Sequence, residues 1–186
     1  ALYGVEYPGY GLAKPGTPTE ASIYAAAEEM LRYLIEERGV ARSRVVLFGQ
    51  SVGCAVAVEM AERGLGGKLV LLSPFTSILD ISTEVYPFLK PALKVMPFMV
   101  LDKCDNAAKA PRLSVPTLVV HGQYDEIVPF AMGQRLAELI PGAQFLPVPG
   151  MGHNDALDRE DVLAAIARFA SVDAPTAPAA AEALPN

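Results

Sequence analysis

Apolar residues follow two different periods along the chain, and the two periods alternate. Residues 45–48 are apolar throughout, which predicts a strand covered on both faces, and residues 68–72 and 117–120 repeat this pattern after a first Lys or Thr. Residues 144–148 predict a last strand. Residues 2–7 also have a strand pattern. Apolar stripes with the period of a helix lie between these runs. The alternation predicts an α/β fold, a mostly parallel sheet flanked by helices.

The first helix has the clearest boundaries in the sequence. Thr17, Pro18 and Glu20 are the residue types expected at an N-cap, at the first helical position and two positions later. An apolar stripe follows, and Gly39 is expected to end the helix. The stripe consists of Ile23, Ala27, Met30, Leu31, Leu34 and Ile35.

Similar stripes predict the other helices. One begins within residues 49–53 and ends near Gly64, and a later one places Met132, Leu136, Leu139 and Ile140 on one face. The last helix opens with Asp158 and Asp161. Its inward side chains are expected to be Val162, Leu163, Ile166, Phe169 and Ala170.

Composition and charge narrow the classes of partner. The 186 residues are 52% hydrophobic, which is enough for one domain with a sizeable core. The net charge of -6 repels phosphate backbones, so nucleic acid is not expected to bind. The two cysteines, Cys54 and Cys104, are too few for a disulfide framework and have no metal-ligand spacing. We therefore expect neither a metal nor a disulfide.

The sequence says little about location in the cell. The most apolar stretch, residues 85–101, is interrupted by prolines and lysines and is not expected to cross a bilayer. No signal-peptide pattern is present, but the chain starts at Ala1 in a strand-like segment and we expect a preceding segment to be missing. The compartment stays unknown, with a cytoplasmic or peripheral membrane location favoured.

The pattern Gly49-x-Ser51-x-Gly53 is the main indication of chemistry. A buried strand ends just before it and a helix begins within it, so Ser51 is expected on a tight turn between the two. Glycines on both sides would remove Cβ clashes at that turn. The amide of Val52 at the helix start could then donate to an oxyanion. A serine that only caps the helix is the alternative interpretation.

A serine hydroxyl needs a base, and the chain has two histidines. His153 follows the last strand, at the carboxyl edge of the sheet where Ser51 is also expected. His121 ends the strand at 117–120 and is expected to be structural, bonding to the neighbouring loop. An exposed loop histidine without function is the alternative for His153.

The base in turn needs a carboxylate that holds its ring. Asp125 follows the strand that contains residues 117–120, on the same edge of the sheet. Its neighbour Glu126 is expected to point elsewhere, whereas Asp80 and Asp102 remain rivals for the role. The chain order serine, aspartate, histidine is the order expected of a nucleophile on such a strand–helix turn.

Five segments together resemble the α/β-hydrolase superfamily. They are Tyr7-Pro8-Gly9-Tyr10-Gly11, Gly49-Gln50-Ser51-Val52-Gly53, Leu72-Ser73-Pro74-Phe75-Thr76-Ser77, His121-Gly122-x-x-Asp125-Glu126-x-Val128-Pro129 and Gly152-His153-Asn154-Asp155. They are most similar to a branch of small serine hydrolases that includes protein depalmitoylases, and the resemblance runs from about residue 2 to 170. It implies Ser51 as nucleophile, Asp125 as acid, His153 as base, Val52 N–H as an oxyanion donor, and no cofactor.

The resemblance also implies what is missing. Family members have further strands before Tyr7, one of which ends in a loop that supplies the second oxyanion donor, and the depalmitoylases carry a cysteine-rich N-terminal segment. We expect the chain to be an α/β-hydrolase domain over residues 1–172, truncated at its N-terminal strands, with a disordered tail over 173–186. Cys54 is expected to pack in the core, with a reactive thiol as the alternative.

Residues 74–110 fall where this fold inserts its lid. Their large apolar side chains either line an acyl pocket or simply cover the sheet: Phe75, Ile78, Leu79, Val85, Phe88, Leu93, Met96, Phe98 and Met99. The expected activity is hydrolysis of carboxylic esters or acyl thioesters, with a small-molecule or lipid-acyl substrate and an acylated protein as a further candidate. The alternatives are a serine peptidase of the same fold and an inactive fragment or binding module.

Overall fold

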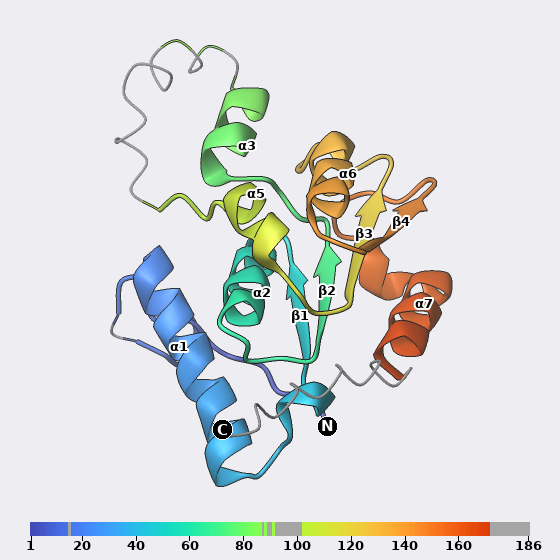
Figure 1. Ribbon diagram of the computed structural model, residues 1–186. Helices are drawn as coiled ribbons and strands as arrows, with labels where there is room; N and C mark the ends of the chain where they lie inside the picture. Colours follow the sequence, from blue (N-terminus) through green and yellow to red (C-terminus); the bar gives the residue numbers. More distant parts are fainter. Residues whose placement is uncertain (15, 87, 89–90, 92–101, 172–186) are drawn as a thin grey trace, which may run out of the picture.

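Four parallel strands form one sheet at the centre of the computed structural model, which describes residues 1–14, 16–86, 88, 91 and 102–171 (Figure 1). The strands are β1 (Val46–Gln50), β2 (Lys68–Leu72), β3 (Thr117–Gly122) and β4 (Gln144–Val148). They lie in the order β1-β2-β3-β4, and every neighbouring pair is parallel. The expected parallel sheet is therefore present, with all carboxyl ends at one edge.

Helices cover both faces of this sheet. They are α1 (Glu20–Arg32), α2 (Val52–Glu62), α3 (Ile78–Val85), α5 (Asn106–Lys109), α6 (Phe130–Leu139) and α7 (Glu160–Ser171). Short 3₁₀ turns span Arg42–Arg44, Ala110–Arg112 and Ala156–Asp158, and a π-helical segment, Tyr33–Glu37, prolongs α1. In Figure 1, α3 lies beyond the arrowheads of β1 and β2, and α6 stands beside the arrowhead end of β3.

Alternate residues of β2 and β3 feed two separate cores. Leu69, Leu71 and Val119 pack with α1, α2 and α6, whereas Val70 and Val120 belong to a second cluster on the α7 face. Side chains of a parallel pair that stand opposite each other point to the same face. The apolar runs at 68–72 and 117–120 therefore are strands covered on both faces, as predicted.

The expectation of two covered faces is wrong for β1. Leu47 is buried, but Val46 and Phe48 are 37% and 44% exposed. Phe48 stands opposite Val70 in the sheet and so points to the α7 face. Val162 of α7 packs against the cluster built from β2, β3 and β4, and this cluster does not reach β1. β1 is an edge strand with one apolar face open.

The expected strand at residues 2–7 is also absent from this described segment, which is irregular and ends in turns at 8–13. Val5 and Tyr7 nevertheless pack against the core beside α1 and α2. A strand needs a partner edge for its backbone groups, and among the described strands β1 pairs with β2 alone. The apolar pattern therefore reflects packing on helices rather than pairing in the sheet.

The start of α1 lies two residues later than predicted. Thr19 is the N-cap, and its side chain accepts a hydrogen bond from Ser22 N while Ser22 Oγ accepts from Thr19 N. This capping box replaces the expected cap at Thr17. At the other end of the chain, Val162 is buried as expected, but Leu163 is 43% exposed, so its predicted inward placement is wrong.

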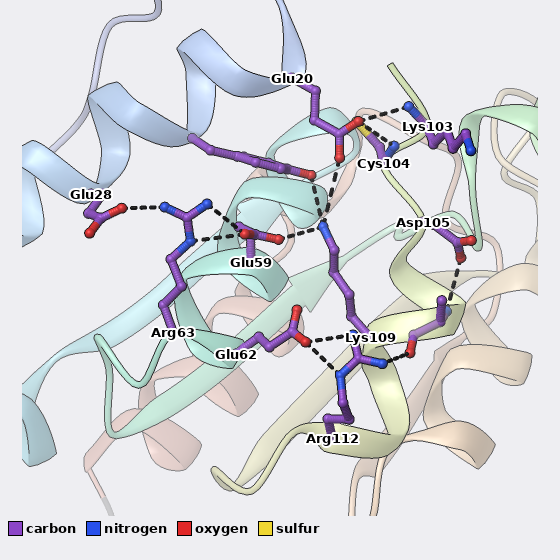
Figure 2. Close-up of polar contacts among 12 residues, drawn as sticks. Glu20, Glu28, Glu59, Glu62, Arg63, Lys103, Cys104, Asp105, Lys109 and Arg112 are labelled. Atoms are coloured by element: carbon purple, nitrogen blue, oxygen red, sulfur yellow. Dashed lines mark hydrogen bonds and ion pairs between the residues drawn. The ribbon is translucent and has the colours of Figure 1, made fainter. Parts of the chain in front are cut away.

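A network of charges ties the helices of one face together (Figure 2). Lys109 Nζ of α5 lies 2.5 Å from Glu59 Oε2 of α2 and 3.8 Å from Glu20 Oε1 of α1. Arg63, just after α2, pairs with Glu59 at 2.7 Å and also with Glu28 of α1. Lys109 and Glu59 are each only 14% exposed, so their charges compensate each other in a region with limited access to water.

Some predictions concern residues outside the described part of the chain. The tail at 173–186 and four of the pocket candidates fall there: Leu93, Met96, Phe98 and Met99. Phe75 is buried among Ala55, Cys104, Val128 and Met132, so it covers the core rather than lining an open pocket. In the described segments, no helix has the length and apolar character needed to cross a bilayer.

Candidate active site

Ser51 lies on a strained turn between β1 and α2. Its backbone has φ of 51° and ψ of −118°, a region that residues with a side chain rarely occupy. Its N–H donates to Leu72 O at 2.9 Å, so the turn is fixed to the end of β2. The predicted strand–turn–helix context of Ser51 is therefore present.

The two glycines of the motif are not equivalent. A Cβ at Gly49 would lie 2.4 Å from Gly53 O and 2.7 Å from Cys54 Cα, so only glycine allows α2 to pack this closely on the end of β1. At Gly53 a Cβ would have no atom within 4 Å. The expected Cβ clash is present at the first glycine and absent at the second.

Cys54 packs behind this turn. Its Sγ is within 3.2 Å of Gly49 O and 3.3 Å of Leu72 O, and the side chain is fully buried. Burial raises the pKa of the Cys54 thiol well above its usual value. Because the thiolate is the reactive form, the geometry agrees with the packing interpretation and not with the reactive thiol.

His153 and Asp125 are in direct contact. His153 Nδ1 lies 3.0 Å from Asp125 Oδ1 and 2.8 Å from Oδ2, and the histidine is 5% exposed. Of the rival carboxylates, Asp102 is engaged elsewhere, because its Oδ1 accepts from Glu20 N, and Asp80 lies in the first turn of α3, where its backbone amide donates to Ser77 Oγ. The structure thus brings together the histidine and the aspartate that the sequence pairs.

Hydrogen bonds surround the Asp125 carboxylate. Its Oδ1 accepts from Ile127 N at 3.0 Å and from Val128 N at 2.8 Å. Burial alone would raise its pKa, but contacts with His121, the Val128 amide, His153 and Ser73 outweigh this effect. They hold the pKa of Asp125 well below its usual range, so the carboxylate is charged at neutral pH.

Ser51, Asp125 and His153 follow β1, β3 and β4 respectively, at the carboxyl edge of the sheet. This parallel arrangement places all three on one edge, as the sequence predicts. Among the described hydrogen bonds, however, none involves Ser51 Oγ. Contacts between nucleophile and base are often long in unliganded structures.

Sequence reasoning missed the involvement of Ser73. It follows β2 with φ of 50°, is fully buried, and its N–H donates to Val120 O. Its Oγ favours the charged form of Asp125, although it makes no well-formed hydrogen bond in the described part of the chain. A Ser-Pro pair directly after a buried strand was the only signal in the sequence, and it does not reveal which carboxylate lies opposite.

The sequence of this chain is similar to those of several known proteins. A family model described as TAP-like protein, Abhydrolase_4, matches residues 97–171. An uncharacterized protein from Mycobacterium tuberculosis is 36% identical over 167 residues, which cover 88% of this chain and 57% of that protein. The human alpha/beta hydrolase domain-containing protein 17B is 32% identical over 155 residues, covering 83% of this chain and 50% of that protein.

The chain belongs to the α/β-hydrolase superfamily. It spans about half the length of the curated relatives it matches, since the Caenorhabditis elegans alpha/beta hydrolase domain-containing protein aho-3, at 34% identity, is covered over 44% of its length.

Solved structures share the α/β-hydrolase fold with this chain. A meta-cleavage product hydrolase from Pseudomonas fluorescens has a TM-score of 0.65 at 18% identity, over 88% of this chain and 77% of that one. A thermophilic esterase from Thermogutta terrifontis has a TM-score of 0.62 at 21% identity, with the same shares covered. These likenesses establish the fold of the sheet and its helices.

Within this α/β-hydrolase fold, Val52 opens α2 directly after Ser51. The first amides of a helix have no partner within the helix, and the helix dipole favours negative charge beside them. The position of the Val52 N–H at the start of α2 is therefore electrostatically favourable for a negative charge beside it.

Proposed function

We propose that the protein is a serine hydrolase that cleaves carboxylic esters or acyl thioesters through an acyl-enzyme on Ser51. One observation carries the proposal: Ser51 lies on a strained strand–helix turn, at the sheet edge where Asp125 holds His153 by its Nδ1. A nucleophile, a base and a residue that orients the base are the parts that acyl transfer requires.

The contact with Asp125 determines which ring nitrogen of His153 acts as the base. Nδ1 donates its hydrogen to the carboxylate, so Nε2 keeps a lone pair that can remove a proton. In the proposed first step, His153 Nε2 takes the proton of Ser51 as Oγ attacks the carbonyl carbon. The Val52 amide donates to the resulting oxyanion.

Collapse of this tetrahedral intermediate breaks the bond to the leaving group. The proton on His153 passes to the leaving oxygen or sulfur, which departs as an alcohol or thiol and leaves an acyl group on Ser51. A water molecule that His153 deprotonates then attacks the acyl-enzyme and releases the acid. Ser51 regains its proton from His153, and no cofactor takes part in this scheme.

Substrates are proposed to be small-molecule or lipid-acyl esters, with acylated proteins as a further candidate. A peptidase would in addition need groups that bind a peptide amine or carboxylate, and the sequence suggests none. Thiols and alcohols also leave more readily than amines. The relatives named as alpha/beta hydrolases and the esterase among the similar structures are consistent with this choice.

A binding module without catalysis is the second candidate. It is favoured by the absence of a described hydrogen bond from Ser51 Oγ to the histidine. Loss of one oxyanion donor typically costs about 10²- to 10³-fold in rate, so an incomplete site could still bind substrate without turning it over at a useful rate.

Labelling with a fluorophosphonate separates these candidates, because the probe reacts with an activated serine and needs no known substrate. We expect a single labelled serine, Ser51, identified by mass spectrometry. Ser51→Ala should remove the label, whereas Ser43→Ala, an exposed serine at the opposite end of β1, should not affect it. Label on a different serine would contradict the assignment of the nucleophile, and no label at all would favour the binding module.

Substrate class is tested with three probes of one acyl chain: a nitrophenyl ester, an acyl thioester and an amide. The proposal expects the ester and the thioester to be hydrolysed faster than the amide. Faster hydrolysis of the amide than of the ester and the thioester would favour the peptidase instead.

A further inference from the structure

His121 lies fully buried at the end of β3, beside the Asp125 carboxylate. Its Nε2 is 3.0 Å from Val128 O and 3.4 Å from Asp125 Oδ2. The ring packs edge-on against Phe130, and a Cβ on Gly133 of α6 would lie 2.0 Å from His121 Nδ1. The imidazole is therefore held in one orientation, with α6 against one ring nitrogen and the loop after β3 against the other.

These contacts determine which ring nitrogen of neutral His121 carries the hydrogen. Nε2 faces a carbonyl and a carboxylate, both of which only accept, so it must be the donor. Nδ1 is buried and has no hydrogen-bond partner among the described residues. A hydrogen placed on Nδ1 would be an unsatisfied buried donor, which is costly.

Val128 links His121 to Asp125 by a second route. Its carbonyl accepts the His121 hydrogen bond, while its amide donates to Asp125 Oδ1 at 2.8 Å. The Ile127 amide donates to the same oxygen. Anchoring the Val128 carbonyl thus keeps two amides of the 125–128 loop directed at the carboxylate.

The Asp125 carboxylate consequently stands between two imidazoles. Its Oδ2 lies 2.8 Å from His153 Nδ1 and 3.4 Å from His121 Nε2. One ring belongs to β3 and the other to the loop after β4, so two separate elements restrict the same oxygen. A carboxylate held in this way has fewer orientations open to it than one that contacts His153 alone.

We infer that His121 is a positioning residue for the pair of Asp125 and His153. Its Nε2–H fixes the carboxylate, directly and through Val128, in the orientation that presents Oδ2 to His153. The effect of His121 on catalysis rests on the proposed function, in which the pair activates Ser51. Its effect on the orientation of Asp125 and His153 does not depend on that function.

The test compares His121→Leu with His121→Gln. Leucine fills similar space without a donor, whereas the glutamine amide can place a donor near the position of Nε2. Each variant leaves His153 as the single histidine of the chain, so its NMR signals are unambiguous. We expect a low-field, slowly exchanging Nδ1 proton of His153 in the wild type and in His121→Gln, and its loss in His121→Leu.

Ester hydrolysis provides a second readout. Misplacing a catalytic group by about 1 Å can cost about 10²-fold in rate, so kcat of His121→Leu should fall about 10- to 100-fold. KM should stay within about twofold, because His121 does not contact the substrate in the proposed scheme. His121→Gln should recover most of kcat.

Two results would overturn the inference: a folded His121→Leu that keeps the low-field proton and kcat, or a folded His121→Gln that loses both as leucine does. If neither variant folds, ¹⁵N shifts of wild-type His121 decide, because hydrogen on Nε2 supports the inference and hydrogen on Nδ1 overturns it. The NMR readouts need no turnover, so they still judge His121 if the wild type neither labels nor hydrolyses esters and the proposed function fails.

Discussion

At the scale of single residues, the turn at Ser51 combines backbone strain with close packing. Its positive φ is tolerated because the amide is bonded to the end of β2 and α2 packs directly on Gly49. Such strain persists only where the surrounding structure enforces it. A side chain added at this turn should therefore destabilise the protein only where it enters the contact between Gly49 and the start of α2.

Alanine at the two glycines of the turn tests this difference. Gly49→Ala places a Cβ 2.4 Å from Gly53 O, so the backbone must shift and the protein should lose about 1–3 kcal/mol of unfolding free energy. Gly53→Ala adds a Cβ in open space within α2, where alanine is favoured over glycine by up to about 1 kcal/mol. Urea unfolding measures both. Equal destabilisation by the two substitutions would contradict the packing argument.

The lowered pKa of Asp125 predicts a dependence of stability on pH. A carboxyl group with a depressed folded pKa stabilises the protein above the unfolded pKa of about 3.9 and loses this contribution as pH falls toward the folded value. The stability difference between wild type and Asp125→Asn should be largest above about pH 5 and shrink below about pH 4. Thermal unfolding across this range measures it, and a constant difference would count against a depressed pKa.

The proposed catalytic residues were visible in the sequence because each has a local signature. Ser51 lies between glycines after an apolar run, and Asp125 and His153 follow two later runs in the expected order. The contacts of His121 and Ser73 with Asp125 were not visible. They arise because β2, β3 and β4 lie side by side, and a single sequence does not specify which loop residues then meet.

At the scale of elements, contacts with distant residues determine which of two possible N-cap residues begins α1. Both Thr17 and Thr19 could cap the helix, and a glutamate or serine follows each at a suitable position. In the structure the Glu20 amide donates to Asp102 Oδ1, and the Glu20 carboxylate accepts from Lys103 N. These partners lie more than eighty residues away, so the sequence favoured the wrong threonine.

Alanine at the two threonines measures which one caps α1. Thr19→Ala should cost about 0.5–2 kcal/mol, because the Ser22 amide loses its acceptor. Thr17→Ala should stay within about 0.5 kcal/mol, since among the described hydrogen bonds Thr17 takes part through its carbonyl, which accepts from Ser22 Oγ and is kept in alanine. If urea unfolding shows that Thr17→Ala loses more unfolding free energy than Thr19→Ala, Thr17 is the N-cap, as the sequence suggested.

At the scale of the whole molecule, the sheet ends at β1 with an open edge. Within the described residues, the backbone groups on this side of the strand face no other strand, and Val46 and Phe48 expose apolar surface beside them. Unprotected edges of this kind pair readily with other chains. The apolar run at 45–48 predicted a strand covered on both faces. The run identifies the strand correctly, but it carries no information on which elements cover each face.

Self-association of the 186-residue chain should therefore depend on this edge. Phe48→Lys places a charge on the open face and should lower the apparent mass in size-exclusion chromatography with light scattering, and reduce binding of an apolar dye. Leu163→Lys is the matched control, because Leu163 is 43% exposed on α7, close to the 44% of Phe48. An equal effect of both substitutions would mean that charge alone, rather than the edge, governs association.

The order of the strands has a consequence for the protein while it is being synthesised. Each strand pairs with the strand that precedes it in the chain, so the sheet can grow one strand at a time as residues leave the ribosome. Ser51 emerges with the first strand, but His153 follows the last one. At about 5–20 residues per second, the 102 residues from Val52 to His153 take roughly 5–20 seconds to add. During this interval the nascent chain carries its proposed nucleophile without its proposed base, so it cannot hydrolyse esters through this pair until the loop after β4 has been made.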